Sequence, residues 1–165
     1  MSLKRIRFIL YLSILFSNAS YSFGQTLSLD DIFKIYALDS IALKQFCAEK
    51  NFELVFIDED DWAFEYSFQS KSDEKIFVYR TFPKDGSAGP FVRYYFNNQH
   101  EYENFEKLIK ARDFDRIKYK SYSKKISTEI STKHFVDPKS EWEIGMEKYN
   151  AGASKYALTL GAFYQ

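Results

Sequence analysis

The sequence of 165 residues carries 23 basic and 23 acidic side chains, and this balance disfavours a general nucleic-acid binder. Its single cysteine, Cys47, excludes an internal disulfide, so packing alone must hold the fold. The 17 Phe, 13 Tyr and 2 Trp supply ample apolar area for one core.

Residues 1–24 have the pattern of a signal peptide. They contain three basic residues, no acidic residue and an apolar run at 8–16. Small residues, Ser22 and Gly24, precede Gln25, so we expect cleavage before Gln25 and export to the periplasm or beyond. The apolar run of about ten residues is half the length that spans a membrane, so we expect no span in the mature chain. The mature chain has 20 basic and 23 acidic residues, a formal charge of −3.

Two helices are predicted at the start of the mature chain, arranged either as a hairpin or as one bent helix. Ser28 is a good N-cap for the first, and Asp39 with Ser40 can cap the second, which runs to about Lys50. Cys47 is expected to be a buried hydrophobe rather than a reactive thiol. The inward side chains are predicted to be Leu29, Ile32, Phe33 and Tyr36 in the first helix, and Ile41, Leu43, Phe46 and Cys47 in the second.

Four strands are predicted next, because aromatic and β-branched runs alternate with clusters of turn-forming residues. The second strand alternates most plainly, so one of its faces is aromatic and the other can meet water. The predicted strands are residues 52–57, 62–69, 75–82 and 91–96, and the aromatic face of the second consists of Trp62, Phe64, Tyr66 and Phe68.

Residues 98–114 contain the clearest helix of the sequence. Asn98 is a good N-cap, and Glu101 stands three residues later, where its carboxylate can accept a hydrogen bond from the cap's own amide. At Phe114 the apolar period changes from 3.6 to 2, which indicates the start of a strand. The predicted buried stripe of this helix is Tyr102, Phe105, Leu108 and Ile109.

Four further strands are expected at residues 116–123, 125–135, 141–149 and 155–164. No linker of Pro, Ser or Gly separates the halves, so residues 25–165 are predicted to form a single domain. The fold class is α+β in the order αα-ββββ-α-ββββ, with an antiparallel sheet and the helices on one face.

The pattern of the first half recurs 62 positions later. Residues 50–53 match residues 112–115, and the helix before each has apolar residues at the same spacing. We interpret this as an internal duplication with repeats at about 28–97 and 98–165. The matched helix positions are Leu43, Phe46 and Cys47 in the first half and Phe105, Leu108 and Ile109 in the second.

Three segments carry a resemblance to known proteins: LDDIF near the mature start, then CAEKNFELVF, then HEYENFEKLIKARDFDRIKY. Together they resemble small secreted proteins of Bacteroidota, and the resemblance carries over no functional residue. In architecture alone, two tandem helix-plus-four-strand units resemble the β-lactamase inhibitor protein fold. That resemblance implies a scaffold that binds other proteins across a concave sheet.

Two charged turns of opposite sign are candidate interaction sites. The carboxylates of residues 58–61 offer the oxygen ligands that a hard cation such as calcium needs, although the run lacks the Gly and the distant Glu of a strong site. Lys120, Lys124 and Lys125 stand at the equivalent turn of the second half. The two turns are either ordinary solvated tips or charges that steer association with a partner or with a second copy.

No catalytic residue, cofactor site or metal site is predicted. Glu141 and Glu143 share one face of a strand about 7 Å apart, as carboxylates do in inverting glycosidases, but we expect both to be solvated. His100 and His134 have no metal-binding spacing, and no nucleophile motif or phosphate-binding loop occurs.

The excess of tyrosine favours a binding surface, because Tyr suits protein interfaces and sugar stacking alike. We therefore expect an exported, non-enzymatic binding or scaffold protein whose partner is a protein or a glycan. The alternative is a secreted hydrolase acting on glycans through carboxylates that converge only in the fold. The tyrosines available for a surface, unless they are ordinary half-covered sheet residues, are Tyr79, Tyr94, Tyr95, Tyr119, Tyr122, Tyr149 and Tyr164.

Overall fold

The computed structural model describes residues 26–84, 89–117, 130–140 and 142–162. The predicted signal peptide and its cleavage site therefore lie outside the described residues, as do Lys120, Lys124, Lys125 and Glu141. None of the helices among the described residues is both long and apolar enough to span a membrane.

Three helices occur where the sequence predicts them: α2 (Leu29–Ala37), α3 (Ser40–Glu49) and α4 (Gln99–Ala111). Their N-caps are the predicted Ser28, Asp39 and Asn98, and each cap's side chain accepts backbone N–H bonds of the first turn. The extended conformation at Leu38 and Asp39 separates α2 from α3, so they are two helices rather than one bent helix.

The described residues contain eight strands, and all their pairings are antiparallel. The predicted α+β class with an antiparallel sheet is therefore confirmed, with boundaries displaced by a few residues. The strands are β1 (Phe52–Glu59), β2 (Ala63–Ser70), β3 (Phe77–Pro83), β4 (Phe91–Phe96), β5 (Asp115–Ile117), β6 (Ile130–Val136), β7 (Trp142–Tyr149) and β8 (Tyr156–Ala162).

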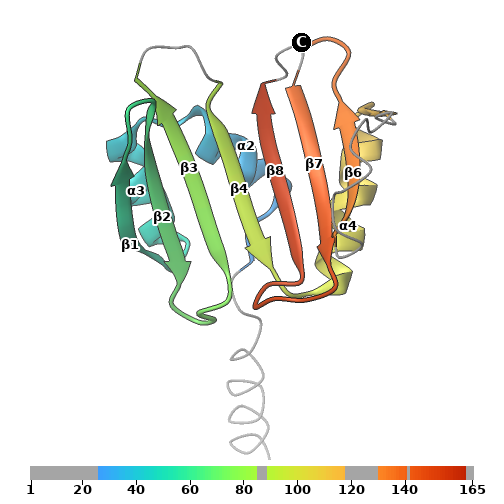
Figure 1. Ribbon diagram of the computed structural model, residues 1–165. Helices are drawn as coiled ribbons and strands as arrows, with labels where there is room; N and C mark the ends of the chain where they lie inside the picture. The colour runs from blue at the N-terminus through green and yellow to red at the C-terminus, as the bar shows by residue number, and fades with distance from the viewer. Residues whose placement is uncertain (1–25, 85–88, 118–129, 141, 163–165) are drawn as a thin grey trace, which may run out of the picture.

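The strands form one sheet in the order β1-β2-β3-β4-β8-β7-β6-β5. The last strand of the chain thus lies beside β4, in the middle of the sheet (Figure 1). In the same view α2 lies behind β4 and β8. This pairing of β4 with β8 brings residues sixty or more positions apart in the sequence next to each other.

The core covers one face of the sheet, called here the core face. Successive register partners across β3, β4, β8 and β7 on this face are Val78, Tyr94, Leu158 and Met146, and all four are fully buried. The helices contribute buried side chains to the same apolar cluster, namely Leu29, Ile32, Ile35, Leu43, Phe46, Cys47, Tyr102, Phe105 and Ile109. The opposite face is called here the open face.

Three side chains predicted to be buried are exposed. Leu108 is 37% exposed, because it lies about 60° around α4 from Phe105, at the margin of the buried arc. Ile41 is 73% exposed, because it lies nearly half a turn around α3 from Leu43 and Phe46. Trp62 is 63% exposed, because it belongs to the turn before β2 rather than to the strand.

Glu101 does not complete the predicted capping box. Its backbone N–H donates to Asn98, but its carboxylate turns to the core and accepts a hydrogen bond of 3.0 Å from the hydroxyl of Tyr94. The other oxygen, Oε2, is buried and has no hydrogen-bond partner among the described residues. Burial raises the pKa of Glu101 from 4.5 to about 7, although the Tyr94 hydrogen bond acts in the opposite direction.

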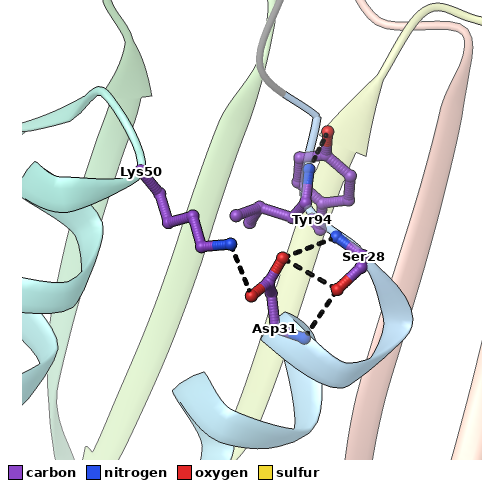
Figure 2. Close-up of polar contacts among 5 residues, drawn as sticks. Ser28, Asp31, Lys50 and Tyr94 are labelled. Carbon is purple, nitrogen blue, oxygen red and sulfur yellow. Dashed lines mark hydrogen bonds and ion pairs between the residues drawn. The ribbon is translucent and has the colours of Figure 1, made fainter.

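A polar cluster fixes the start of α2 (Figure 2). Ser28 and Asp31 form a reciprocal capping box, and the Lys50 ammonium lies 2.8 Å from Asp31 Oδ1. The backbone N–H of Leu27 donates to the hydroxyl of Tyr94 over 3.4 Å. Burial alone would raise the pKa of Asp31, but the hydrogen bonds from Lys50 and Ser28 lower it overall. The cluster thereby joins α2 to the end of α3 and to β4.

Candidate functional site

The register of four strands places Arg93, Thr159, Gly145 and His134 in one row across the open face. Arg93 of β4 pairs with Thr159 of β8, Thr159 pairs with Gly145 of β7, and Gly145 pairs with His134 of β6. The next row on the open face, two residues away along each strand, contains Gly161 of β8 beside Glu143 of β7. Charged side chains therefore stand at both ends of a stretch that has only small residues in its middle.

These rows form a hollow of about 370 Å³, called here the central hollow. Gly145 and Gly161 lie in its floor and have no side chain to fill it. A Cβ atom built on Gly145 would lie 3.8 Å from the Cβ of Thr159, which is an ordinary contact. The complete lining is Gly89, Pro90, Phe91, Arg93, His134, Glu143, Gly145, Glu147, Thr159 and Gly161.

One side of the central hollow is a network of Arg93, Glu147 and Tyr149. The Arg93 guanidinium forms an ion pair with Glu147 and donates to the Tyr149 hydroxyl over 2.7 Å, and that hydroxyl donates to Glu147. Burial alone would lower the pKa of Arg93, but the Glu147 charge and the neighbouring tyrosines raise it. Burial and the Glu147 carboxylate raise the pKa of Tyr149, so the phenol keeps its proton.

The other side is a pair formed by His134 Nδ1 and Glu143 Oε1. The two residues come from adjacent strands, and Glu143 has only 19% of its side chain exposed. Glu143 thus lies on the face opposite Trp142 and Ile144, as predicted, but neighbours cover most of it. On one side of the hollow the charges of Arg93 and Glu147 oppose each other, and on the other side the Glu143 carboxylate has the His134 ring as its partner.

Two buried polar atoms at the hollow have no hydrogen-bond partner among the described residues. They are Oγ1 of Thr159 and Nε of Arg93, which belong to paired residues of the same row. A buried polar atom without a partner costs free energy, and native proteins keep few of them. Both residues line the hollow, so this part of the open face keeps polar atoms whose hydrogen-bonding capacity is not used within the described residues.

Aromatic rings line a second recess beside the central hollow. Phe77, Tyr79, Tyr95 and Tyr149 form a row of neighbouring rings, called here the aromatic row, with centroids 5.6 to 6.3 Å apart. The rings are half-buried and surround a recess of about 280 Å³. The Arg93 guanidinium lies 5.1 Å from the centre of the Tyr95 ring, so it connects the aromatic row with the central hollow.

A third recess, of about 220 Å³, has an acidic lining that includes Asp58, Asp60 and Glu65. Burial, followed by the charges of Asp58 and Asp60, raises the pKa of Glu65. Asp60 Oδ1 accepts from the backbone N–H groups of Trp62 and Ala63, and Lys84 lies 2.9 Å from Glu59. No group of three His, Cys, Asp or Glu that could hold a metal occurs within the described ranges.

The other residues singled out in the sequence take different places. Tyr79, Tyr95 and Tyr149 lie on the open face, whereas Tyr94 is in the core and His100 is exposed in the first turn of α4. Cys47 is buried, and burial raises its pKa to about 12. Steered contact through the lysine turn stays a prediction, because that turn lies outside the described residues. Glu141, Tyr119, Tyr122 and Tyr164 also lie outside the described residues.

Sequence reasoning missed the central hollow, although a local signal for its floor exists. Alternation along β7 places Glu143, Gly145 and Glu147 on one face, and alternation along β8 places Ala157, Thr159 and Gly161 on one face. Charged residues around small ones on a solvated face would have indicated a recess. Comparison of the chain with protein-family models, with curated proteins and with solved structures gives no match.

Proposed function

We propose that the protein is an exported, non-enzymatic binding protein whose ligand lies on the open face of the sheet. The observation that carries this proposal is the central hollow, where Gly145 and Gly161 leave space among the polar side chains of Arg93, Glu143 and Glu147. Every residue of the row belongs to a strand that pairs with a neighbour on both sides, so the backbone under the hollow is held by hydrogen bonds of the sheet. A preformed recess with a few fixed polar groups is typical of a small-molecule site.

A glycan is the ligand class that suits this surface best. Half-exposed rings of the aromatic row offer apolar faces to the C–H groups of a sugar. The Arg93–Glu147 ion pair and the His134–Glu143 pair offer donors and acceptors to neutral hydroxyl groups. Because the charges of Arg93 and Glu147 balance each other, this side of the hollow favours a neutral saccharide over a strongly charged one. A protein is the second candidate partner, since Tyr and Arg are also enriched at protein interfaces.

A glycan hydrolase remains the alternative function, because Glu143, Glu147 and His134 line one hollow. Two features weigh against it. Glu143 and Glu147 are four residues apart on β7, so their Cα atoms are about 13 Å apart, and each carboxylate is held by a different partner on its own side of the hollow. Each carboxylate also has a basic partner, whereas a general acid needs a proton that is free to leave.

Binding and hydrolysis can be separated in one experiment. The purified protein is titrated with a panel of neutral oligosaccharides of different linkage while backbone amide NMR shifts are recorded, and each sugar is afterwards analysed by mass spectrometry. Binding predicts saturable shifts in β4, β7 and β8 with every sugar recovered intact. Shortened sugars would support the hydrolase. With no shift in the panel, pull-down from the envelope fraction followed by mass spectrometry identifies a protein partner instead.

We also propose that the sheet consists of two tandem units of about 28–97 and 98–165, with all helices on one face. The strand order supports it, because each unit contributes four consecutive strands and the units meet through their last strands, β4 and β8. The helix ends support it too. Asn51 and Asp113 are the non-glycine residues with positive φ in the described chain, at 60° and 63°, and they are 62 positions apart.

A further inference from the structure

The edge strand β1 exposes a continuous apolar run. It stands at the end of the strand order and, among the described residues, pairs only with β2 (Figure 1). Its four central side chains are Leu54, Val55, Phe56 and Ile57, with exposures of 38%, 46%, 53% and 43%. The opposite edge strand, β5, has three residues, of which Asp115 and Arg116 are exposed and charged.

Such an edge is a template for an additional strand. An edge strand presents a row of backbone N–H and C=O groups, and natural proteins usually protect it with charges, with proline or by making it short. In β1 the only irregularity is the register shift between Leu54 and Phe56. Four consecutive exposed apolar residues are otherwise unfavourable in water, so a docking role accounts for them.

Charged residues at both ends of the apolar run determine which kind of additional strand can pair with it. Glu53 and Asp58 bound the run, and both are exposed. They point to the open face, since their partners on β2 are Gln69 and Glu65. If a second copy added its own β1 with Leu54 opposite Ile57, Glu53 would stand opposite Asp58 of that copy. Like charges directly opposite each other destabilise a strand pair, so a second copy is disfavoured.

We propose that β1 binds an extended segment of another protein, in which three apolar β-forming residues lie between two basic residues, the same spacing that separates Gln69 and Glu65, the β2 partners of Glu53 and Asp58. Backbone hydrogen bonds to the free edge supply affinity, and the basic residues opposite Glu53 and Asp58 supply specificity. The same pattern fits both strand directions, because both ends of the run are acidic. This surface is separate from the central hollow and does not depend on the function proposed for it.

Two peptide probes and a charge-swapped variant test this proposal. The probes are labelled Lys-Val-Ile-Val-Lys and Glu-Val-Ile-Val-Glu, and fluorescence anisotropy with the purified protein gives each Kd. We expect the lysine peptide to bind about tenfold more tightly than the glutamate peptide, and addition of salt to reduce the difference. In the double variant Glu53→Lys/Asp58→Lys the preference should reverse. Both positions are exposed, so the variant should fold.

A backbone control distinguishes strand addition from nonspecific attraction. N-methylation of alternate amides in the lysine peptide keeps its side chains and charges but removes ladder donors, so binding should be lost. Equal binding of the two charged peptides, an unchanged preference in the swapped variant or undiminished binding of the methylated peptide would each overturn the proposal. A dimer in sedimentation velocity that Phe56→Lys dissociates would overturn it in favour of a second copy as the occupant.

Discussion

Two corners of the molecule, between α3 and β1 and between α4 and β5, have similar backbone conformations but different side-chain packing. The C-caps Lys50 and Arg112 have the same ψ of 16°, and the next residues, Asn51 and Asp113, both adopt positive φ. One turn earlier, Phe46 is 6% exposed and Leu108 is 37% exposed. The corner geometry is therefore common to both halves, whereas the depth at which each helix packs differs.

The strands that follow differ as well. β1 has eight residues with an apolar centre, while β5 has three. The N-terminal ends of the helices also differ: α4 has 13 residues and α3 has 10, and Glu101 lies in the additional turn, at the position equivalent to the N-cap Asp39. If the two halves descend from one unit, the helix-to-strand turn is what both have retained. Three stability measurements test whether the two corners behave alike.

The largest expected difference is between Phe46→Ala and Leu108→Ala. Truncation of the buried ring should lower the free energy of unfolding by about 3–5 kcal/mol, whereas truncation of the exposed leucine should cost about 1 kcal/mol or less. Urea unfolding measures both, with the exposed Lys107→Ala as control. Equal losses at the two positions would show that the helices pack alike and that Leu108 belongs to the core after all.

The second prediction concerns the carboxyl group of Glu101 in the additional turn of α4. Its pKa is about 7 in the folded protein and 4.5 in the unfolded chain, so between these values the folded state binds more protons. Stability should then fall as the pH rises from about 4.5 to 7, by up to about 3 kcal/mol. Glu101→Gln, which resembles the protonated acid, should remove this loss.

The measurement for Glu101 is chemical unfolding of wild type and variant at several pH values from 4 to 8, with Glu103→Gln on the same helix as control. The stability of Glu101→Gln relative to wild type should increase with pH. A difference that stays constant across the series would mean that the carboxyl group is not buried as described.

The smallest expected effect tests the shared turn itself. Asn51→Ala and Asp113→Ala should each cost about 1 kcal/mol, because a β-carbon without a polar group is unfavourable at positive φ. Asn51→Gly and Asp113→Gly should be neutral or slightly stabilising. Parallel behaviour of the two positions in thermal unfolding would support the duplication, and a cost at only one of them would count against it.

Local features of the fold could be predicted from the sequence, because they depend on neighbouring residues. The caps Ser28, Asp39 and Asn98 and the alternation of Phe64, Tyr66 and Phe68 are of this kind. Burial at the margin of a helix was harder to predict from the sequence, since the width of the buried arc depends on what the helix packs against. Leu108 was misassigned for this reason, whereas Ile41 lies nearly opposite Leu43 and Phe46 on α3, so the helical period itself places it outside the buried arc.

The candidate site could not be predicted because it depends on strand register. Arg93 meets Thr159 only through the pairing of β4 with β8, and His134 meets Glu143 only through the pairing of β6 with β7. Tyr79, Tyr95 and Tyr149 could be named as surface candidates, but Tyr94, next to Tyr95, faces the core. No pattern within a single strand determines which strand becomes its neighbour.

The most direct test of the proposed open-face site is Gly145→Val, examined for stability and for binding to the same oligosaccharide panel. Valine fits an extended strand better than glycine, and its β-carbon meets only Thr159 at 3.8 Å, so stability should stay equal or rise by about 1 kcal/mol. Its side chain fills the floor of the central hollow, so binding should be lost, whereas Thr132→Val, on the same face but outside the hollow, should bind normally. Undiminished binding by a folded Gly145→Val protein would contradict the assignment of the site.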